Sequence, residues 1–191
     1  MSKIVTIVGV GALGSHLVQF LRSEDVTLRV IDFDRVEYKN VKSQFHAKSN
    51  VGALKVNGLA KTVQFLYGMG IETFPHRLVE DNASVLLKGD LIIDCLDNGA
   101  SRRLVQKVVR EKDLACLHGA LAADGTFGRV VWDKDFIIDD ESGEGEATCE
   151  NGEFLPFIAV TSAYLARSAQ LYLRDGIKTG FSISPGSVFS I

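Results

Sequence analysis

The residues best suited to chemistry begin with a glycine-rich loop, Gly9-Val10-Gly11-Ala12-Leu13-Gly14. The loop follows a β-branched run at residues 3–8, which predicts a buried strand, and precedes a stretch with helical spacing. In this setting the first glycine permits a tight turn, the second lets a phosphate approach the backbone, and the third lets the helix pack on the sheet. The loop predicts a phosphate site at a helix N-terminus. The alternative is a glycine turn that holds no ligand.

An acidic residue, Asp32, comes directly after the second predicted strand, at residues 26–31. In dinucleotide-binding folds an acid at this place accepts hydrogen bonds from ribose hydroxyls. The simpler alternative is that Asp32 is only a turn residue. With the glycine loop, Asp32 predicts a nucleotide with a free ribose diol, and at this point NAD and ATP fit equally well.

The segments that follow narrow the choice. They contain, in order, Asp32-Phe33-Asp34, Glu37, Asn40, Gln44, Val51-Gly52-Ala53-Leu54-Lys55, Asp94-Cys95-Leu96-Asp97-Asn98 and Arg102. In this order the sequence resembles the ThiF/MoeB/HesA family of ubiquitin-activating-enzyme-like proteins, whose members show GxGxxGS, DxDxVExxNxxRQ, VGxxK and DCxDN with an Arg soon after. The match extends along most of the chain. Several ordered motifs are far more specific than a glycine loop alone.

The resemblance implies an ATP-dependent adenylyltransferase. Such an enzyme activates a C-terminal carboxylate, usually the Gly-Gly end of a ubiquitin-like or sulfur-carrier protein, by attack on the α-phosphate of ATP. The products are an acyl-adenylate and pyrophosphate, and some members then pass the acyl group to a cysteine. ATP and Mg²⁺ are the implied cofactors, and a homodimer or a complementing subunit is the implied assembly.

Two other functions stay open. One is a non-catalytic subunit that binds nucleotide and completes a site in a partner. The other is an NAD-dependent oxidoreductase, which explains the glycine loop and Asp32 but leaves Lys55 and Asp97-Asn98 without a role.

The matched residues suit adenylylation, because a carboxylate attacking a phosphate needs charge neutralised on both reactants. Lys55, at the start of a predicted helix, is expected to reach the phosphates held by the loop of Gly9, Gly11, Ala12 and Gly14. Asp97, beside Asn98 at the carboxyl end of a strand, is expected to bind Mg²⁺. The structural alternatives are a solvated Lys55 and a helix cap at Asp97-Asn98.

The remaining matched residues have supporting roles. Asn40 and Gln44 offer amide donors to phosphate or ribose oxygens. Arg102, in preference to Arg103, is expected to add positive charge or to orient Asp97. Asp34 and Glu37 are interpreted as surface charges of a loop. The four histidines are interpreted as structural or surface residues: His16, His46, His76 and His118.

Cys149 is the candidate nucleophile for acyl transfer. The Thr148-Cys149 pair, ahead of a predicted helix, resembles a Thr-Cys segment of the family, and the glycine-rich residues 139–152 predict a mobile loop. The flanking Glu146 and Glu150 oppose this role, because nearby anions raise the pKa of a thiol. Cys95 and Cys116 fall on predicted buried strands and are interpreted as core residues.

The sequence departs from the family at four points. No N-terminal helix with an Arg that reaches a partner's ATP precedes the first strand, and Ser43 stands where the family usually has Arg. Loss of one transition-state donor costs about 100-fold or more in rate. The paired CxxC motifs for structural zinc are missing, so no zinc is expected, and Ala12 fills a position often held by Gly. Together these departures allow a reduced or partner-dependent member, and they also allow a nucleotide-binding subunit with little catalysis of its own.

The elements that must position these residues alternate between strand and helix. Strands are predicted at residues 3–8, 26–31, 71–74, 91–93 and 114–121, and helices after the glycine loop and at 53–67 and 101–111. Short connections between them predict a doubly wound, Rossmann-like α/β fold with a mainly parallel sheet. The C-terminal part should be antiparallel, with a returning strand at 127–132, a helix at 156–173 and an edge hairpin at 181–191.

Composition excludes several classes of protein. The 191 residues, of which 46% are hydrophobic and 24% charged, fit one folded domain over residues 1–191 rather than a disordered chain. A net charge of -3 opposes direct nucleic-acid binding by charge. No apolar run approaches the ~20 residues of a membrane helix. Three cysteines without a CxxC pair predict no disulfide framework and fit the cytoplasm.

Overall fold

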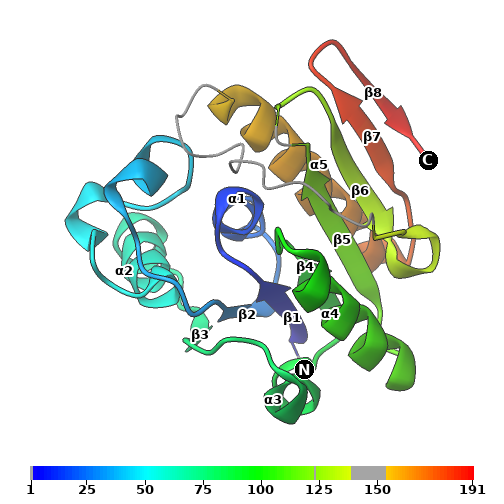
Figure 1. Ribbon diagram of the computed structural model, residues 1–191, viewed down its shortest axis with the longest axis horizontal. Helices are drawn as coiled ribbons and strands as arrows, with labels where there is room; N and C mark the ends of the chain where they lie inside the picture. Colours follow the sequence, from blue (N-terminus) through cyan, green and yellow to red (C-terminus); the bar gives the residue numbers. More distant parts are fainter. Residues whose placement is uncertain (1, 123, 139–153) are drawn as a thin grey trace.

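The computed structural model describes residues 2–122, 124–138 and 154–191. Its strands form one sheet in the order β3-β2-β1-β4-β5-β6-β7-β8 (Figure 1). The parallel part comprises β1 (Lys3–Val8), β2 (Val26–Ile31), β3 (Glu72–Phe74), β4 (Leu91–Asp94) and β5 (Cys116–Leu121). The antiparallel part adds β6 (Gly128–Trp132), β7 (Phe181–Ser184) and β8 (Ser187–Ser190). The predicted fold class and the C-terminal edge hairpin are confirmed.

The strand order reverses at β1, which pairs with β2 on one side and with β4 on the other. In open α/β sheets, ligands bind at the carboxyl ends of the strands at such a reversal. The loops that follow β1, β2 and β4 meet at this edge, and they carry the glycine loop, Asp32 and Asp97. The topology therefore brings together candidates that are up to 88 positions apart in the sequence.

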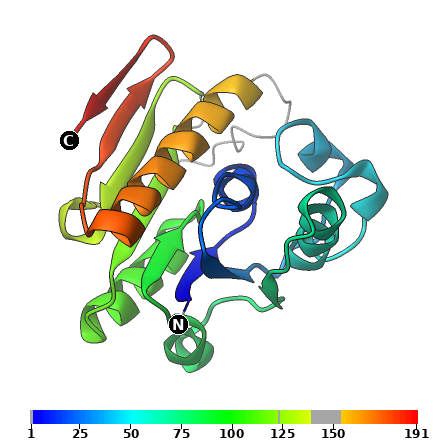
Figure 2. The same ribbon diagram turned by 180° about the vertical axis from the view of Figure 1, so that it is seen from behind.

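Helices cover both faces of the sheet (Figures 1 and 2). One face carries α1 (Ala12–Phe20), α2 (Lys55–Tyr67) and α5 (Leu155–Asp175), and the other carries α3 (Glu80–Leu86) and α4 (Gly99–Glu111). Each layer encloses a separate hydrophobic core, because central strands place apolar side chains alternately on the two faces. Thus Val5 and Ile7 of β1 face α1, whereas Val8 joins the core beneath α4.

Helix boundaries follow local sequence rules. The first turn of α5 contains Pro156, whose missing N–H costs nothing there, and the helix ends at Gly176 with φ of 71°. The helix α2 starts at Lys55, two residues later than the start predicted at residue 53, because Leu54 is extended and pairs with Arg35 in an isolated bridge. Among the described residues, no helix has the length and apolarity required to cross a bilayer.

Candidate functional site

The glycine loop connects β1 to α1 at the carboxyl edge of the sheet. Gly9 has φ of 86°, which L side chains rarely adopt, and its N–H donates to the carbonyl oxygen of Ile31 at 2.8 Å. A Cβ on Gly14 would lie 1.9 Å from the carbonyl oxygen of Gly9, so no side chain fits there. These two glycines have the turn and packing roles expected from the sequence.

The second glycine of the loop faces open space. Gly11 is the N-cap of α1, and no side chain caps this helix. A Cβ on Gly11 would meet only the amide nitrogen of Gln44, at 3.9 Å. The first backbone N–H groups of the helix, beginning at half-buried Ala12, have no intrahelical acceptor. These N–H groups and the open space at Gly11 form a cradle at the start of α1, which we call the glycine cradle. Its chemistry and shape fit a phosphate.

Asp32 lies next to this cradle and fixes its geometry. Its Oδ2 accepts from the backbone N–H of Val10 at 2.9 Å, and its Oδ1 accepts from that of Asp34 at 2.8 Å. Burial raises the pKa of the Asp32 carboxyl, and the nearby charge of Lys55 and the two backbone donors oppose that rise. Because a carboxylate has about four acceptor sites, two backbone bonds leave capacity for a ribose diol.

Lys55 turns back toward the loop after β2. Its Nζ lies 3.0 Å from Oδ2 of Asp34, and its backbone N–H donates to the carbonyl of Asp34 at 2.8 Å. The Lys55 side chain is 11% exposed, whereas that of Asp34 is 48% exposed. Lys55 is therefore not the solvated surface charge of the alternative interpretation. Asp34 is more than a loop-surface charge, because it orients the lysine.

The segment between β2 and α2 brings two predicted amide residues to the site. Asn40, within the short helix η1 (Tyr38–Lys42), is buried, and its Oδ1 accepts from the N–H of Glu37 at 2.8 Å. Gln44 is also buried and lies beside Gly11. Asn40 thus has a structural contact as a helix cap, while Gln44 is the closer of the two to the phosphate cradle. A contact of either residue with nucleotide stays a prediction.

Two histidines support the same region, and sequence reasoning had no signal that placed them there. His46 Nε2 donates to the carbonyl of Val10 at 2.9 Å, inside the glycine loop. Burial lowers the pKa of His46 to about 4, so it is neutral at pH 7. His16 Nε2 donates to the carbonyl of Ser43 at 3.0 Å. Ser43, at the position where the family usually has Arg, is fully buried.

The loop after β4 carries Asp97 and Asn98. Asp97 is exposed at the carboxyl edge of the sheet. Asn98 is the N-cap of α4, and its Oδ1 accepts from the backbone N–H of Ser101 at 2.8 Å. The helix-cap alternative therefore holds for Asn98 and leaves the carboxylate of Asp97 available to an ion. A contact of Asn98 with nucleotide stays a prediction.

Arg102 lies inside the fold, 8% exposed, rather than at the surface of the site. Its guanidinium donates to the carbonyl oxygens of Leu96 and, at 3.0 Å, Gly119, and lies 3.6 Å from Oδ2 of Asp94. These contacts bind the backbone of the loop that carries Asp97. They support the predicted orienting role of Arg102 more than a direct contact with phosphate.

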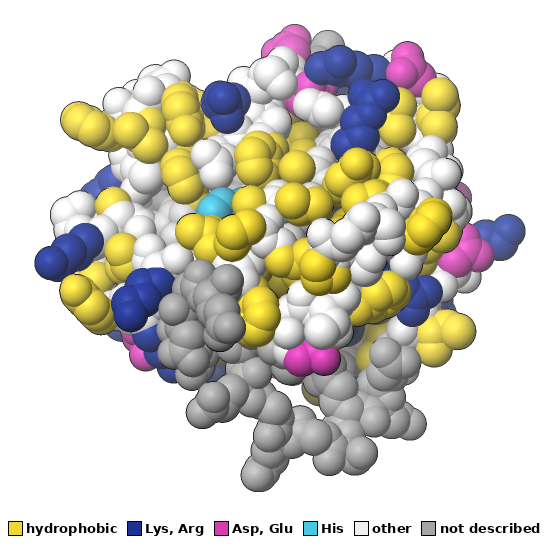
Figure 3. All heavy atoms as spheres, turned by 90° about the horizontal axis from the view of Figure 1, so that it is seen from above, with side chains coloured by type: hydrophobic (Ala, Val, Ile, Leu, Met, Phe, Trp, Pro, Cys, Tyr) yellow, Lys and Arg dark blue, Asp and Glu magenta, His cyan; other side chains and the backbone are white. Residues whose placement is uncertain are grey.

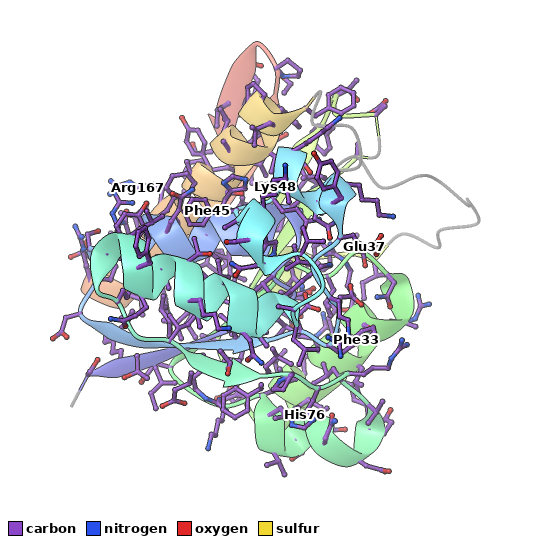
Figure 4. The ribbon with its side chains drawn as sticks, turned by 90° about the vertical axis from the view of Figure 1, so that its left-hand side faces the viewer. Phe33, Glu37, Phe45, Lys48, His76 and Arg167 are labelled. Carbon is purple, nitrogen blue, oxygen red and sulfur yellow. The ribbon has the colours of Figure 1, made fainter. Side chains whose placement is uncertain are left out.

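An aromatic platform lies beside Asp32. Phe33 follows β2 and is 42% exposed, and the guanidinium carbon of Arg77 lies 4.0 Å from the centre of its ring. Figure 4 shows Phe33, with His76 on the neighbouring loop after β3. Aromatic rings and guanidinium planes are surfaces on which nucleobases stack. Sequence reasoning missed this pair because Arg77 is distant in the chain.

The cysteines divide into two groups. Cys149, with Glu146 and Glu150, falls outside the described residues, as does the predicted loop at 139–152. Cys116 is buried in β5 as expected, whereas Cys95 follows β4 and is half-buried. Burial raises the pKa of both thiols, which makes them poor nucleophiles. Within the described part of the chain, no three His, Cys, Asp or Glu side chains cluster as a metal centre.

The comparisons with known proteins agree with this arrangement. The ThiF family model matches residues 2–174, and the chain belongs to the ThiF family. The adenylyltransferase and sulfurtransferase MOCS3 of Caenorhabditis briggsae is 36% identical over 127 residues, which cover 63% of this chain and 31% of that protein. The SAMP-activating enzyme E1 of Haloferax volcanii is 32% identical over 125 residues, covering 63% and 46%.

Solved structures share the fold. MccB of E. coli, crystallised with ATP, superposes with a TM-score of 0.81 at 13% identity, covering 99% of this chain and 63% of that chain. PaaA superposes with a TM-score of 0.75 at 18% identity, covering 99% and 62%. The chain spans less than half the length of these curated relatives and about 62–63% of these two solved chains.

Proposed function

We propose that this protein catalyses ATP-dependent adenylylation of a C-terminal carboxylate, on a ubiquitin-like or sulfur-carrier protein ending in Gly-Gly. The observation that carries the proposal is the meeting of the glycine cradle, Asp32, Lys55 and Asp97 at one edge of the sheet. The names of the relatives, an adenylyltransferase and a SAMP-activating enzyme, support this class of reaction. The cytoplasm is the proposed location.

The charge of each site residue determines its proposed role. Backbone N–H groups at Gly11 and Ala12, with Lys55, bind phosphate oxygens and stabilise negative charge as the α-phosphate is attacked. Asp32 accepts hydrogen bonds from the ribose, and Phe33 with Arg77 offers a stacking surface for the base. Asp97 suits Mg²⁺, a hard ion that takes one or two carboxylates with phosphates and waters and neutralises charge on the nucleotide.

The remaining candidates have roles around this centre. Gln44 lies where its amide can donate to a phosphate, and Asn40 holds the segment that carries it. Arg102 orients the loop of Asp97. Cys149 is the proposed acceptor if the acyl group is transferred after adenylylation.

A second subunit is part of the proposal. Seen from the side of α5 (Figure 3), hydrophobic side chains are spread across the face of the molecule. Among the exposed residues of the helix α5 are Pro156, Val160 and Ala163. A homodimer or a complementing subunit would cover such a face. Ser43 favours a variant of the proposal in which the chain binds nucleotide and a partner supplies the missing cation.

ATP–pyrophosphate exchange tests the proposal. The protein, with a candidate carrier ending in Gly-Gly, should exchange pyrophosphate into ATP only when the carrier carboxylate is present. Asp97→Ala should lose exchange while it still binds ATP, and Asp175→Ala, an exposed change at the end of α5, should not. Unchanged exchange in Asp97→Ala would contradict the role of Asp97. Exchange that appears only with a second subunit would favour the partner-dependent form, and binding of NAD but not ATP would overturn both.

A further inference from the structure

A buried network of charged side chains lies beneath the loop of Asp97. At its centre, His118 of β5 is fully buried and stacks on Phe136, with ring centroids 4.2 Å apart. Its Nδ1 lies 2.7 Å from Oδ2 of Asp94, and its Nε2 lies 3.1 Å from Oδ1 of Asp133. From the sequence, His118 was interpreted only as a structural or surface residue near the site.

The geometry determines the protonation of this imidazole. A neutral imidazole carries one N–H, so one carboxylate would face a ring lone pair in a buried environment. Two N–H groups satisfy both carboxylates. Burial opposes the charge, but the hydrogen bonds to Asp133 and Asp94 outweigh it and raise the pKa of His118 to about 11. The Cys116 thiol, whose Sγ lies 3.5 Å from Nε2, adds to this rise of the His118 pKa.

Further cations complete the network. Arg102 approaches Oδ2 of Asp94 from α4, and Arg110 of the same helix bonds Asp133 at 2.7 Å. Burial raises the pKa of Asp133, but its hydrogen bonds with His118 and Arg110 outweigh burial and hold that pKa at about 2. Every carboxylate of the network therefore has a cationic partner on each side.

The network ends one residue before Asp97. Oδ1 of Asp94 accepts from the backbone N–H of Leu96 at 2.9 Å, and Arg102 donates to the carbonyl of Leu96. Both polar backbone groups of Leu96 are thus tied to Asp94 or to its partner. A shift of Asp94 must move the backbone that positions the Asp97 carboxylate.

We propose that His118, as a buried imidazolium held between Asp94 and Asp133, is a positioning residue for Asp97 and sets the affinity of the site for Mg²⁺–nucleotide. This inference rests on the proposed function only in assigning Asp97 to Mg²⁺. The effect is expected to be selective, because the glycine cradle and Asp32 belong to different loops. Outer partners of metal ligands typically change metal affinity by about 10- to 100-fold.

The first test measures the charge directly. In ¹⁵N-histidine-labelled protein, NMR should show His118 with protons on both ring nitrogens throughout pH 6–9, assigned by its loss in His118→Gln. Asp133→Asn keeps an acceptor for Nε2 but removes a carboxylate, so it should lower the pKa of His118. A singly protonated His118 at pH 7 in the unaltered protein would overturn the proposal.

The second test measures ATP binding by calorimetry with Mg²⁺ and with EDTA. His118→Gln should weaken Mg²⁺–ATP binding about tenfold or more and leave ATP binding in EDTA nearly unchanged. Asp133→Asn should act in the same direction and more weakly. Asp135→Asn, an exposed change on the same short helix η3 (Asp133–Asp135), should have no effect. Equal losses with and without Mg²⁺, or no loss in either variant, would refute positioning of Asp97. If His118→Gln does not fold, Asp133→Asn decides alone. If these binding effects are found but no pyrophosphate exchange occurs, the proposed function is refuted and this inference stands.

Discussion

Replacement by alanine should have different effects at Gly11 and at Gly14, the second and third glycines of the loop. In Gly14→Ala the new Cβ would lie 1.9 Å from the carbonyl oxygen of Gly9. Real Cβ contacts stay beyond 3.0 Å, so backbone must move by about 1.1 Å, at a typical overpacking cost of about 1–3 kcal/mol or more. The gain of about 1 kcal/mol from replacing a helical glycine offsets only part of this. We therefore expect a net loss of about 1–2 kcal/mol.

Gly11→Ala separates binding from stability. Its Cβ would meet only the Gln44 amide nitrogen at 3.9 Å, and an alanine N-cap costs no more than about 1 kcal/mol. The methyl group would nevertheless occupy the space into which a phosphate must come. Urea unfolding should therefore show Gly14→Ala as the less stable variant, and calorimetry should show ATP affinity lost in Gly11→Ala. ATP affinity equal to that of the parent in Gly11→Ala would refute the phosphate cradle.

Two further changes probe the electrostatics of the same edge. Asp34→Asn keeps an acceptor for Lys55 and removes a negative charge, so ATP should bind about 3- to 10-fold more tightly in calorimetry, while stability falls by less than about 1 kcal/mol because the Asp34 carboxylate is half exposed. The second concerns His46, whose pKa is lowered by burial to about 4. The folded state then binds fewer protons than the unfolded state below pH 6.5, so stability is complete above that pH and decreases toward pH 4, by about 2 kcal/mol at pH 5. Urea unfolding at pH 7.5 and 5 should show this loss of unfolding free energy in the parent and a smaller loss in His46→Gln. An equal loss in both proteins would contradict the prediction.

The sequence predicted the architecture well where one strand or helix carries its own signal. Residues 26–31 were predicted as a strand and form β2, because an apolar, β-branched run bounded by polar residues has few other stable states. The seven-residue helix α3 was not predicted, since two turns give too little periodicity. The start of α2 was misplaced because the bridge between Leu54 and Arg35 is a tertiary contact.

The same distinction between local signals and tertiary contacts holds for the site residues. Ordered motifs identified the glycine loop, Asp32 and Lys55, but not the groups that each of them contacts in the fold. Nothing in the local sequence pairs His118 with Asp94, 24 positions earlier, or with Asp133, 15 positions later, because the parallel register of β4 and β5 creates the first contact. Likewise, the burial of Arg102 depends on the packing of α4 over β4 and β5, so the sequence left open whether Arg102 adds positive charge or orients Asp97.

The charges at the carboxyl edge explain why the site should depend on a divalent cation. The acidic candidates there are Asp32, Asp34 and Asp97, and Lys55 is already paired with one of them. A triphosphate that binds beside three carboxylates is attracted by the helix N-terminus, which carries about half a positive charge, and by the lysine, which carries one. These positive charges do not balance the negative charge of the triphosphate. In the proposed site Asp97 would hold Mg²⁺, and the ion would turn this carboxylate from a group that repels the phosphates into a ligand. The hydrogen bonds at the backbone of Leu96 would then support the site, because Mg²⁺ demands near-ideal octahedral geometry and is bound well only by a carboxylate whose position is fixed.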